Sequence, residues 1–465
     1  MSRSRRTKRQ KRKQEIDELE VPKLEALEQI NLNAAGLDIG DDEIYVAVPE
    51  RRDDVSVRVF QTFTRDLYAL ANWLETCGVE TVAMESTGVY WIPTYEILEE
   101  RGFEVYLVNA RHVKNVPGRK TDILDCQWIQ QLHTYGLLRA SFRPPEDICA
   151  LRALVRHRDN LIRSCTAEIQ RMQKALQLMN VKLTNVISDI TGVTGMKIIR
   201  DIVAGERDPH KLAQHRNPHC AKSEAEIAKS LEGNYKPEHV FALKQTLEAY
   251  DFYQQQIKDC DVEIEKRYAA FAPKVDIAEK PLQPRKRKRN KPEGNEPDFT
   301  LRQYLYQMAG VDLTQIDGVN ALTVQKVLSE TGVDMSPWPT VKHFTSWLSL
   351  SPHNDKTGGK IIRSRTKKTQ NRAAAALRMA AQSLAHSQSA LGGYHRSMKA
   401  KLGKPEGVTA TAHKLARIIY AMLKNQTEYR DAGEGYYEEQ ARQRAIRSLK
   451  RKAKKLGFGL VPNTT

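Results

Sequence analysis

Four acidic residues in the first part of the chain have the types and positions that suit metal-assisted chemistry. Asp38 interrupts the apolar stretch GLDIG, and Glu85 ends the apolar stretch TVAME. Asp122 and Asp125 are three positions apart, so both project from one side of a helical turn. A carboxylate among apolar residues is costly unless a positive group meets it. Each acid alone has a structural explanation, such as Asp122 at a helix N-terminus, but the four together predict one site.

Divalent cations are the positive groups that best fit this set of acids. Carboxylate oxygens are hard ligands and select Mg²⁺ or Mn²⁺. Two such ions suit phosphoryl transfer on nucleic acid. We therefore expect catalytic and metal-binding roles for Asp38, Glu85, Asp122 and Asp125.

The segments around the acids alternate between strand and helix patterns. Short apolar or alternating stretches predict strands at residues 35–40, 43–48, 55–60, 81–84 and 103–108. Helical spacing predicts helices at 65–76, 91–101 and 121–138. The order β-β-β-α-β-α-β-α predicts an α/β domain with a mixed sheet at residues 34–148. Asp38 and Glu85 would be neighbours if the first and fourth strands pair, at the strand ends where ligand sites gather.

Beyond residue 148 the chain has a helical pattern. Apolar residues step by three and four along 162–179 and 240–264, as in heptad seams. They fit an antiparallel helical hairpin, an oligomer contact or an ordinary bundle core. We expect a helical coiled-coil region at 149–275 with an insert at 183–237, a basic Pro-rich linker at 276–298, and a mostly α-helical C-terminal domain at 299–430. That domain should contain a polar loop at 351–369 and long helices at 371–387 and 408–423.

The charge balance indicates a polyanionic partner. The 465 residues include 74 Lys and Arg against 57 Asp and Glu, a net charge of +17. The positive charge clusters in a tail at 1–33, in the linker, where it includes Arg285, Lys286 and Arg287, and in a C-terminal tail at 431–465. One run is often only a solvated segment, but three favour nucleic-acid contact. The first two runs lack apolar periodicity and should be disordered until they meet phosphate.

Several protein classes are excluded by the same sequence. No run approaches 18 apolar residues, so a transmembrane span is not expected. The basic N-terminus has no apolar stretch behind it, which argues against a cleaved export signal. The six cysteines form no CxxC pair and suit a reducing cytoplasm.

The stretch from residue 36 to 144 resembles the DEDD-type insertion-sequence transposases related to the pilin-gene invertase, described as bridge-RNA-guided recombinases. The matching segments are GLDIG, MESTGVYWIP, LVNARHVKNVPGRKTDILDCQW and LHTYGLLRASFRP. The resemblance resumes with IDGVNALTV, WLSLSPHNDKTGGK, NRAAAALRMAAQSL and TATAHKLARIIY. The long middle region is similar to that of the larger subgroup of the family.

The resemblance implies an RNase H-like N-terminal domain of the Holliday-junction-resolvase type, whose DEDD acids are the four named above. It also implies a C-terminal nucleophile, a serine five residues after a proline. Five residues after Pro352 this chain has Thr357, so we expect Thr357 to attack, with Ser364 or Thr366 as alternatives. Expected nucleic-acid contacts are Arg119, Lys120, Gly358, Gly359, Lys360, Arg363 and Arg365, besides the linker bases Arg285, Lys286 and Arg287.

The function implied is a site-specific DNA transposase or recombinase of an insertion sequence. A structured noncoding (bridge) RNA would guide it, and strands would be exchanged through a covalent hydroxyl–phosphodiester intermediate. Its partners would be donor and target double-stranded DNA, the guide RNA, and further copies of the chain as a dimer pairing to a tetramer, with no membrane involved. The location would be the cytoplasm of a prokaryote, at the nucleoid. Two alternatives are a junction-resolving metal nuclease without a covalent intermediate and a catalytically impaired nucleic-acid-binding remnant.

Overall fold

The computed structural model describes residues 28–86, 88–109, 122–284, 294–433, 435–459 and 461. The chain divides by its contacts into two compact units, Met1–Arg143 and Pro144–Thr465. The predicted nucleic-acid contacts Arg119, Lys120, Arg285, Lys286 and Arg287 lie outside the described residues, as does the basic run at 3–13. None of the described helices combines the length and apolar character that crossing a bilayer requires.

The first unit is built on a five-stranded mixed sheet with the strand order β3-β2-β1-β4-β5. β1 pairs antiparallel with β2 and parallel with β4, and β5 runs parallel to β4. The predicted element order and the mixed sheet are therefore confirmed. The elements are β1 Ala34–Ile39, β2 Glu43–Ala47, β3 Val57–Gln61, α2 Thr64–Thr76, β4 Thr81–Glu85, α3 Trp91–Glu100, β5 Glu104–Val108 and α5 Asp122–Thr134.

Different helices cover the two faces of this sheet. Leu37 of β1 and Met84 of β4 belong to the core that the sheet forms with α2 and α3. Ala83 of β4 packs instead against α5, next to Ile129. Because successive side chains of a strand point to opposite faces, each strand contributes to both layers. The α5 layer is the one that concerns the acids.

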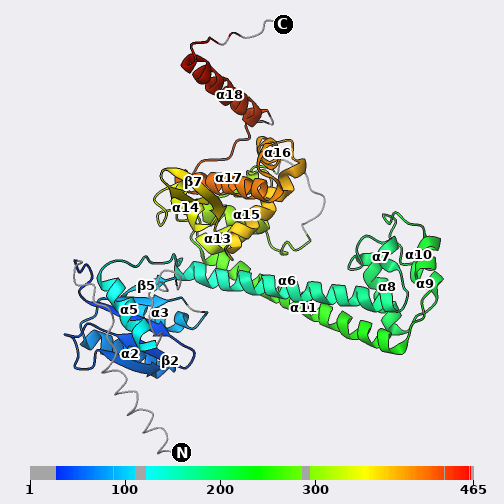
Figure 1. The fold of residues 1–465 in the computed structure, drawn as a ribbon. Coiled ribbons are helices and arrows are strands. Elements are labelled where there is room, and N and C mark those ends of the chain that lie inside the picture. The colour runs from blue at the N-terminus through cyan, green and yellow to red at the C-terminus, as the bar shows by residue number, and fades with distance from the viewer. Residues whose placement is uncertain are drawn as a thin grey trace, which may run out of the picture. The chain divides into compact units, whose positions relative to one another are not determined.

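The second unit contains a long helical hairpin made of α6 Glu146–Leu178 and α11 Pro237–Ala270 (Figure 1). The two helices are antiparallel, since Gln254 donates to the Cys165 sulfur at 3.3 Å while Arg158 is paired with Asp261 further along. At the end where α6 stops and α11 begins, four short helices enclose a separate apolar core. These are α7 Leu183–Val186, α8 Val193–Ala204, α9 Pro209–Ala213 and α10 Glu224–Ser230. The antiparallel hairpin is thus the arrangement present, while coiled-coil packing stays a prediction.

The remaining elements of this unit form a helical bundle with one β-hairpin. Phe344 is fully buried there, with its ring 5.0 Å from that of Trp338 and 5.7 Å from that of Tyr420. The elements are α12 Leu301–Ala309, η1 Leu313–Gln315, α13 Ala321–Thr331, α14 Val341–Trp347, β6 Pro352–Thr357, β7 Lys360–Thr366, α15 Arg372–Ser383, η2 Leu384–His386, α16 Ala390–Leu402, α17 Lys404–Asn425 and α18 Tyr436–Lys455.

One expectation for this region was wrong, because the polar loop expected at 351–369 is mostly the β6–β7 hairpin. The hairpin is exposed along most of its length, so it lacks the buried, alternating face by which a strand is recognised in a sequence. The basic tail expected at 431–465 contains the helix α18.

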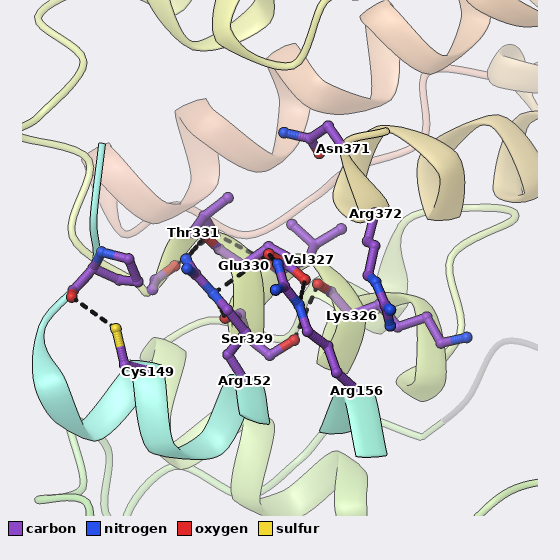
Figure 2. A network of polar contacts seen from close by, with 12 residues as sticks. Cys149, Arg152, Arg156, Lys326, Val327, Ser329, Glu330, Thr331, Asn371 and Arg372 are labelled. Carbon is purple, nitrogen blue, oxygen red and sulfur yellow. Dashed lines mark hydrogen bonds and ion pairs between the residues drawn. The ribbon is translucent and has the colours of Figure 1, made fainter. Parts of the chain in front are cut away.

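An ion-pair cluster joins α6 to the bundle within the second unit (Figure 2). Glu330, buried at the end of α13, accepts two hydrogen bonds from Arg156 of α6 at 2.9 and 2.7 Å. One turn along α6, Asp159 lies 3.0 Å from Lys326 and 3.8 Å from Arg372, the first residue of α15. α15 begins a few residues after β7 ends. The cluster therefore holds the chain that follows the β-hairpin against α6.

A buried histidine joins α5 to the sheet in the first unit. His133 of α5 is completely inaccessible to solvent, and its Nε2 atom lies 2.8 Å from the Thr81 hydroxyl on β4. The centroid of its ring lies 4.6 Å from that of Tyr106 on β5, and the two ring planes are tilted by 54°. Burial disfavours the charged imidazolium and lowers the pKa of His133 from 6.5 to about 4.

We predict that this unit loses stability as the pH falls from 6.5 towards 4. In that interval unfolded His133 binds a proton and folded His133 does not, so protonation favours unfolding. The depressed pKa corresponds to about 3 kcal/mol of unfolding free energy, present above pH 6.5 and lost by pH 4. Thermal unfolding of wild type and His133→Gln across this range measures the effect, and the variant curve should be flatter. Parallel curves would contradict the assignment.

Candidate active site

The site begins with the contact between α5 and β1. Gly36 lies beneath α5, and a Cβ atom at that position would overlap the backbone of Cys126 and Gln130. Further back along the strand, the Gln130 side chain donates to the Ala34 carbonyl at 3.3 Å. The helix therefore runs antiparallel to β1 with its backbone almost on the strand. Its first turn lies over the end of β1 that carries Asp38.

The first two acids share one face of the sheet. Leu37 of β1 is in register with Met84 of β4, so Asp38 and Glu85 are the next residues on two neighbouring parallel strands. Leu37 and Met84 face α2 and α3, which places Asp38 and Glu85 on the α5 face. Both acids are half-buried. The predicted pairing of the first and fourth strands is thus confirmed.

The other two acids lie in the first turn of α5. Asp122 is exposed and Asp125 is half-buried. Burial raises the pKa of the neighbouring Cys126 thiol, and the negative charges of Asp38 and Asp125 raise it further. The Asp38 carboxylate on β1 and the Asp125 carboxylate on α5 therefore both lie near enough to the buried Cys126 thiol to raise its pKa. The structure brings all four predicted acids to one region between the sheet and α5.

The acids nevertheless do not form a closed metal cage. In the part of the chain that the structure describes, no three His, Cys, Asp or Glu side chains converge closely enough to hold an ion. Like charges repel, so uncompensated carboxylates are expected to stay apart. The donor set fits Mg²⁺ or Mn²⁺ in kind, because all four groups offer hard oxygen atoms.

The predicted nucleophile lies at the tip of the β6–β7 hairpin. Thr357 pairs with Lys360 across a two-residue loop formed by Gly358 and Gly359, whose φ angles are +55° and +77°. Positive φ at both loop residues is the requirement of a type I′ turn, which glycine meets without strain. The turn itself therefore accounts for the two glycines, and their contact with phosphate stays a prediction.

The register of the hairpin decides which side chains share a face with Thr357. Lys360 pairs with Thr357, Arg363 with Asp355, and Arg365 with His353. Paired residues point to the same face, and so do alternate residues along a strand. Thr357, Lys360, Arg363 and Arg365 are all exposed and share one face, on which His353 and Asp355 also lie. The face is basic, because Lys360, Arg363 and Arg365 outnumber the one carboxylate.

This common face depends on a β-bulge. Between the pairs Lys356–Ile361 and Asp355–Arg363 the residue Ile362 has no partner. The extra residue interrupts the alternation, so Lys360 and Arg363 reach the same face although they are three positions apart. Bulges are common beside active sites, where they redirect side chains.

The two alternative nucleophiles lie on the other face. Ser364 pairs with Asn354 and Thr366 pairs with Pro352, one residue out of phase with the pairs of Thr357, Arg363 and Arg365. Neither hydroxyl therefore shares a face with the three cations. The geometry favours Thr357 over both.

Two components of this arrangement were absent from the sequence interpretation. Gly36 was noted only as part of the motif around Asp38, although a glycine inside a strand often marks the close approach of another backbone. The polar sequence of residues 351–369 predicts a loop, and a loop has no register from which a bulge could be inferred. The Gly358–Gly359 pair, followed by the β-branched residues Ile361 and Ile362, was the available signal for a hairpin.

Comparison with known proteins defines the class first. A family model for DEDD transposases of IS110, described as a transposase, matches residues 35–181, which include all four acids. A second model, described as the transposase IS116/IS110/IS902 family, matches residues 310–396, which include Thr357. Both matched regions identify the chain as a transposase of an insertion sequence. More particularly, it is a transposase of the IS110 type. DNA is therefore its partner. No curated protein matches the chain.

We predict that Gly36→Ala displaces α5 and inactivates the enzyme. The new methyl group meets backbone rather than a flexible side chain, so the helix must move, at a cost of about 1–3 kcal/mol or more. Unfolding measurements and an assay of DNA cleavage check this. The control is Gly102→Ala, where nothing lies within 4 Å of the added Cβ and the strain comes from a φ of +86° alone. The control should lose about 1 kcal/mol and keep its activity. An active, stable Gly36→Ala enzyme would show that the contact is not needed.

Proposed function

We propose that this transposase is a site-specific DNA recombinase in which Thr357 attacks a DNA phosphodiester at a site that the four acids help to form. The observation that carries the proposal is the shared face of Thr357, Lys360, Arg363 and Arg365 on the hairpin. The strand order β3-β2-β1-β4-β5, antiparallel on one side of β1 and parallel on the other, supports an RNase H-like first unit.

The proposed reaction conserves the number of phosphoester bonds. The Thr357 oxygen forms a bond to phosphorus as the bond from phosphorus to the 3′ oxygen breaks. The hydroxyl proton is lost from Thr357, and the leaving 3′ oxygen takes up a proton. The products are a covalent protein–DNA phosphodiester and a free 3′-OH, and reversal on a second strand completes the exchange. No ATP is needed, since bond energy is retained.

The cationic face of the hairpin has a defined role in this step. Lys360 pairs directly with Thr357 and would meet the non-bridging oxygens of the attacked phosphate, while Arg363 and Arg365 lie further along the same face and would contact neighbouring phosphates. Charge that develops on those oxygens in the transition state is then stabilised by donors already in place. The methyl group of threonine adds bulk that serine lacks, so the attack is more crowded than with a serine.

The acids would supply the second half of the site. Asp38, Glu85, Asp122 and Asp125 would hold Mg²⁺ or Mn²⁺, which when bound stabilises negative charge on the scissile phosphate. The carboxylates themselves would hold the ions in position. Because the carboxylates are negatively charged, a phosphate could approach them only when cations are bound. Their position between the sheet and α5 supports the proposal.

We further propose a guide RNA and an oligomer. The resemblance to bridge-RNA-guided recombinases suggests that a structured noncoding RNA selects the donor and target DNA, and the net charge of +17 suits two polyanionic partners. Exchange of two duplexes needs more than one cleavage, which favours a dimer that pairs into a tetramer. In that assembly the acids of one copy would act with Thr357 of another.

Substitution of Thr357 is the direct test of the nucleophile. Thr357→Ala should eliminate the covalent adduct, because no hydroxyl remains, while DNA binding persists. Thr357→Ser should retain or increase adduct formation, because it removes only the crowding methyl group. Ser364→Ala and Thr366→Val, on the opposite face, are matched controls and should form the adduct as wild type does. Denaturing gels with end-labelled DNA detect the adduct, and mass spectrometry locates it.

Three results would change the proposal. An adduct mapped to Ser364 or Thr366 would show that the wrong hydroxyl was chosen. DNA cleavage by wild type without any adduct would indicate a metal nuclease that uses water. Neither cleavage nor adduct, with DNA binding intact, would indicate an impaired copy.

Amide substitution tests the acids. Asp38→Asn and Asp125→Asn keep the side-chain shape and remove the charge, so each should abolish strand exchange. Neither should lower the melting temperature, and relief of repulsion among the carboxylates should raise it. Strand exchange by the Asp38→Asn, Asp125→Asn double variant in the presence of EDTA would rule out the metal role.

A further inference from the structure

The helix α18, Tyr436–Lys455, has no role in the proposed reaction. Among the described elements without such a role, it has the greatest concentration of positive charge. Residues 442–455 contain eight Lys and Arg and no Asp or Glu. Arg447, Lys450, Arg451 and Lys454 are all exposed. A cluster of this kind on a folded element needs an explanation, because like charges on neighbouring turns of a helix repel.

The first turn of α18 packs against the bundle. The Tyr437 ring lies 5.1 Å from that of Tyr394 on α16, and the Lys414 ammonium lies 5.0 Å from the same ring. Burial in this contact raises the pKa of Tyr437. The anchor therefore sits at one end of the helix, and the basic residues follow it.

The distribution of charge along α18 supports the helix without further packing. Glu439 accepts a hydrogen bond from Gln443, four residues on, at 2.7 Å. Lys452, Lys454 and Lys455 lie in the last turn, where cations favour the helix dipole. The basic segment is therefore an ordered rod of about 21 Å, from 14 residues at 1.5 Å each.

The apolar residues of α18 leave most of its circumference to the bases. Ile446, Leu449 and Ala453 step by three and four and share one narrow stripe. A helix that binds a membrane surface buries a broad face of Trp, Phe and Leu. This stripe has one leucine and no aromatic residue. The helix is thus suited to a polyanion rather than to a lipid bilayer.

We infer that α18 is a duplex-DNA-binding helix that lies in the major groove. The major groove of B-form DNA, about 12 Å wide, admits an α-helix of 10–12 Å diameter. The major groove of an A-form RNA duplex is too deep and narrow for side chains to read. A rigid basic helix therefore distinguishes DNA from duplex RNA, which a flexible basic tail does not. This inference rests on the proposed function, since it assigns the DNA partner of that reaction to an element outside the active site.

The test compares charge removal with loss of helical structure in the full-length protein. In one variant, Lys450→Gln, Arg451→Gln, Lys454→Gln and Lys455→Gln remove four charges, and glutamine keeps nearly the same helix propensity. In the other, Ser448→Pro breaks the helix at an exposed position and leaves every charge in place. Binding is measured over a salt series to a DNA duplex of random sequence, to an RNA duplex of the same sequence and length, and to phosphatidylserine vesicles.

The charge variant should bind DNA about tenfold more weakly or worse at 0.1 M salt. Its slope of log affinity against log salt should fall by about 2 to 3.6, since each phosphate contact contributes roughly 0.9. Ser448→Pro should also weaken DNA binding, and RNA-duplex binding should change less in both variants. Equal losses for DNA and RNA, DNA binding by Ser448→Pro equal to that of wild type, or a loss confined to vesicles would overturn the inference.

The two proposals fail independently in this design. Adduct formation by the wild-type protein on its own DNA ends tests the transposase reaction without reference to α18. A wild-type adduct together with unchanged DNA affinity in the charge variant would reject the role of α18 and leave the proposed reaction standing.

Discussion

The backbone of α5 lies directly on β1 at Gly36, and this contact fixes where the acids of the first unit can meet. The strand carries Asp38 two residues beyond the glycine, and the helix presents Asp122 and Asp125 in its first turn. The parallel pairing of β1 and β4 adds Glu85 on the same face. If a larger side chain separated helix and strand, each acid would keep its place on its own element, but the set would no longer share one space.

A second local constraint governs the hydroxyl in the other unit. The bulge at Ile362 keeps Arg363 and Arg365 on the face of Thr357, although a one-residue change of register moves every side chain of a strand to the other face. The exposed hairpin also leaves this face accessible to a phosphodiester. Each of the two groups of predicted catalytic residues therefore depends on backbone geometry: a close helix–strand contact for the acids and a bulged turn for Thr357.

The sequence was informative where charged residues interrupt a hydrophobic pattern. Asp38 and Glu85 stand out because a charge in an apolar strand is costly, and the strand and helix periods of the first unit predicted its element order correctly. The hairpin was missed because an exposed strand needs no apolar period, so its polar sequence looks like a loop. The role of Gly36 could not be predicted, because it depends on which helix approaches the strand, a tertiary contact that spacing along the chain does not encode.

The claim that the four acids form one metal site is tested most directly by Mn²⁺ binding to the full-length protein, followed by electron paramagnetic resonance. The wild-type protein should bind Mn²⁺, and Asp38→Asn or Asp125→Asn should each weaken binding by about tenfold or more, since either removes a ligand. Asp54→Asn, a change of an exposed acid in the same unit, should leave binding unchanged. Equal Mn²⁺ affinity in wild type, Asp38→Asn and Asp125→Asn would contradict the account.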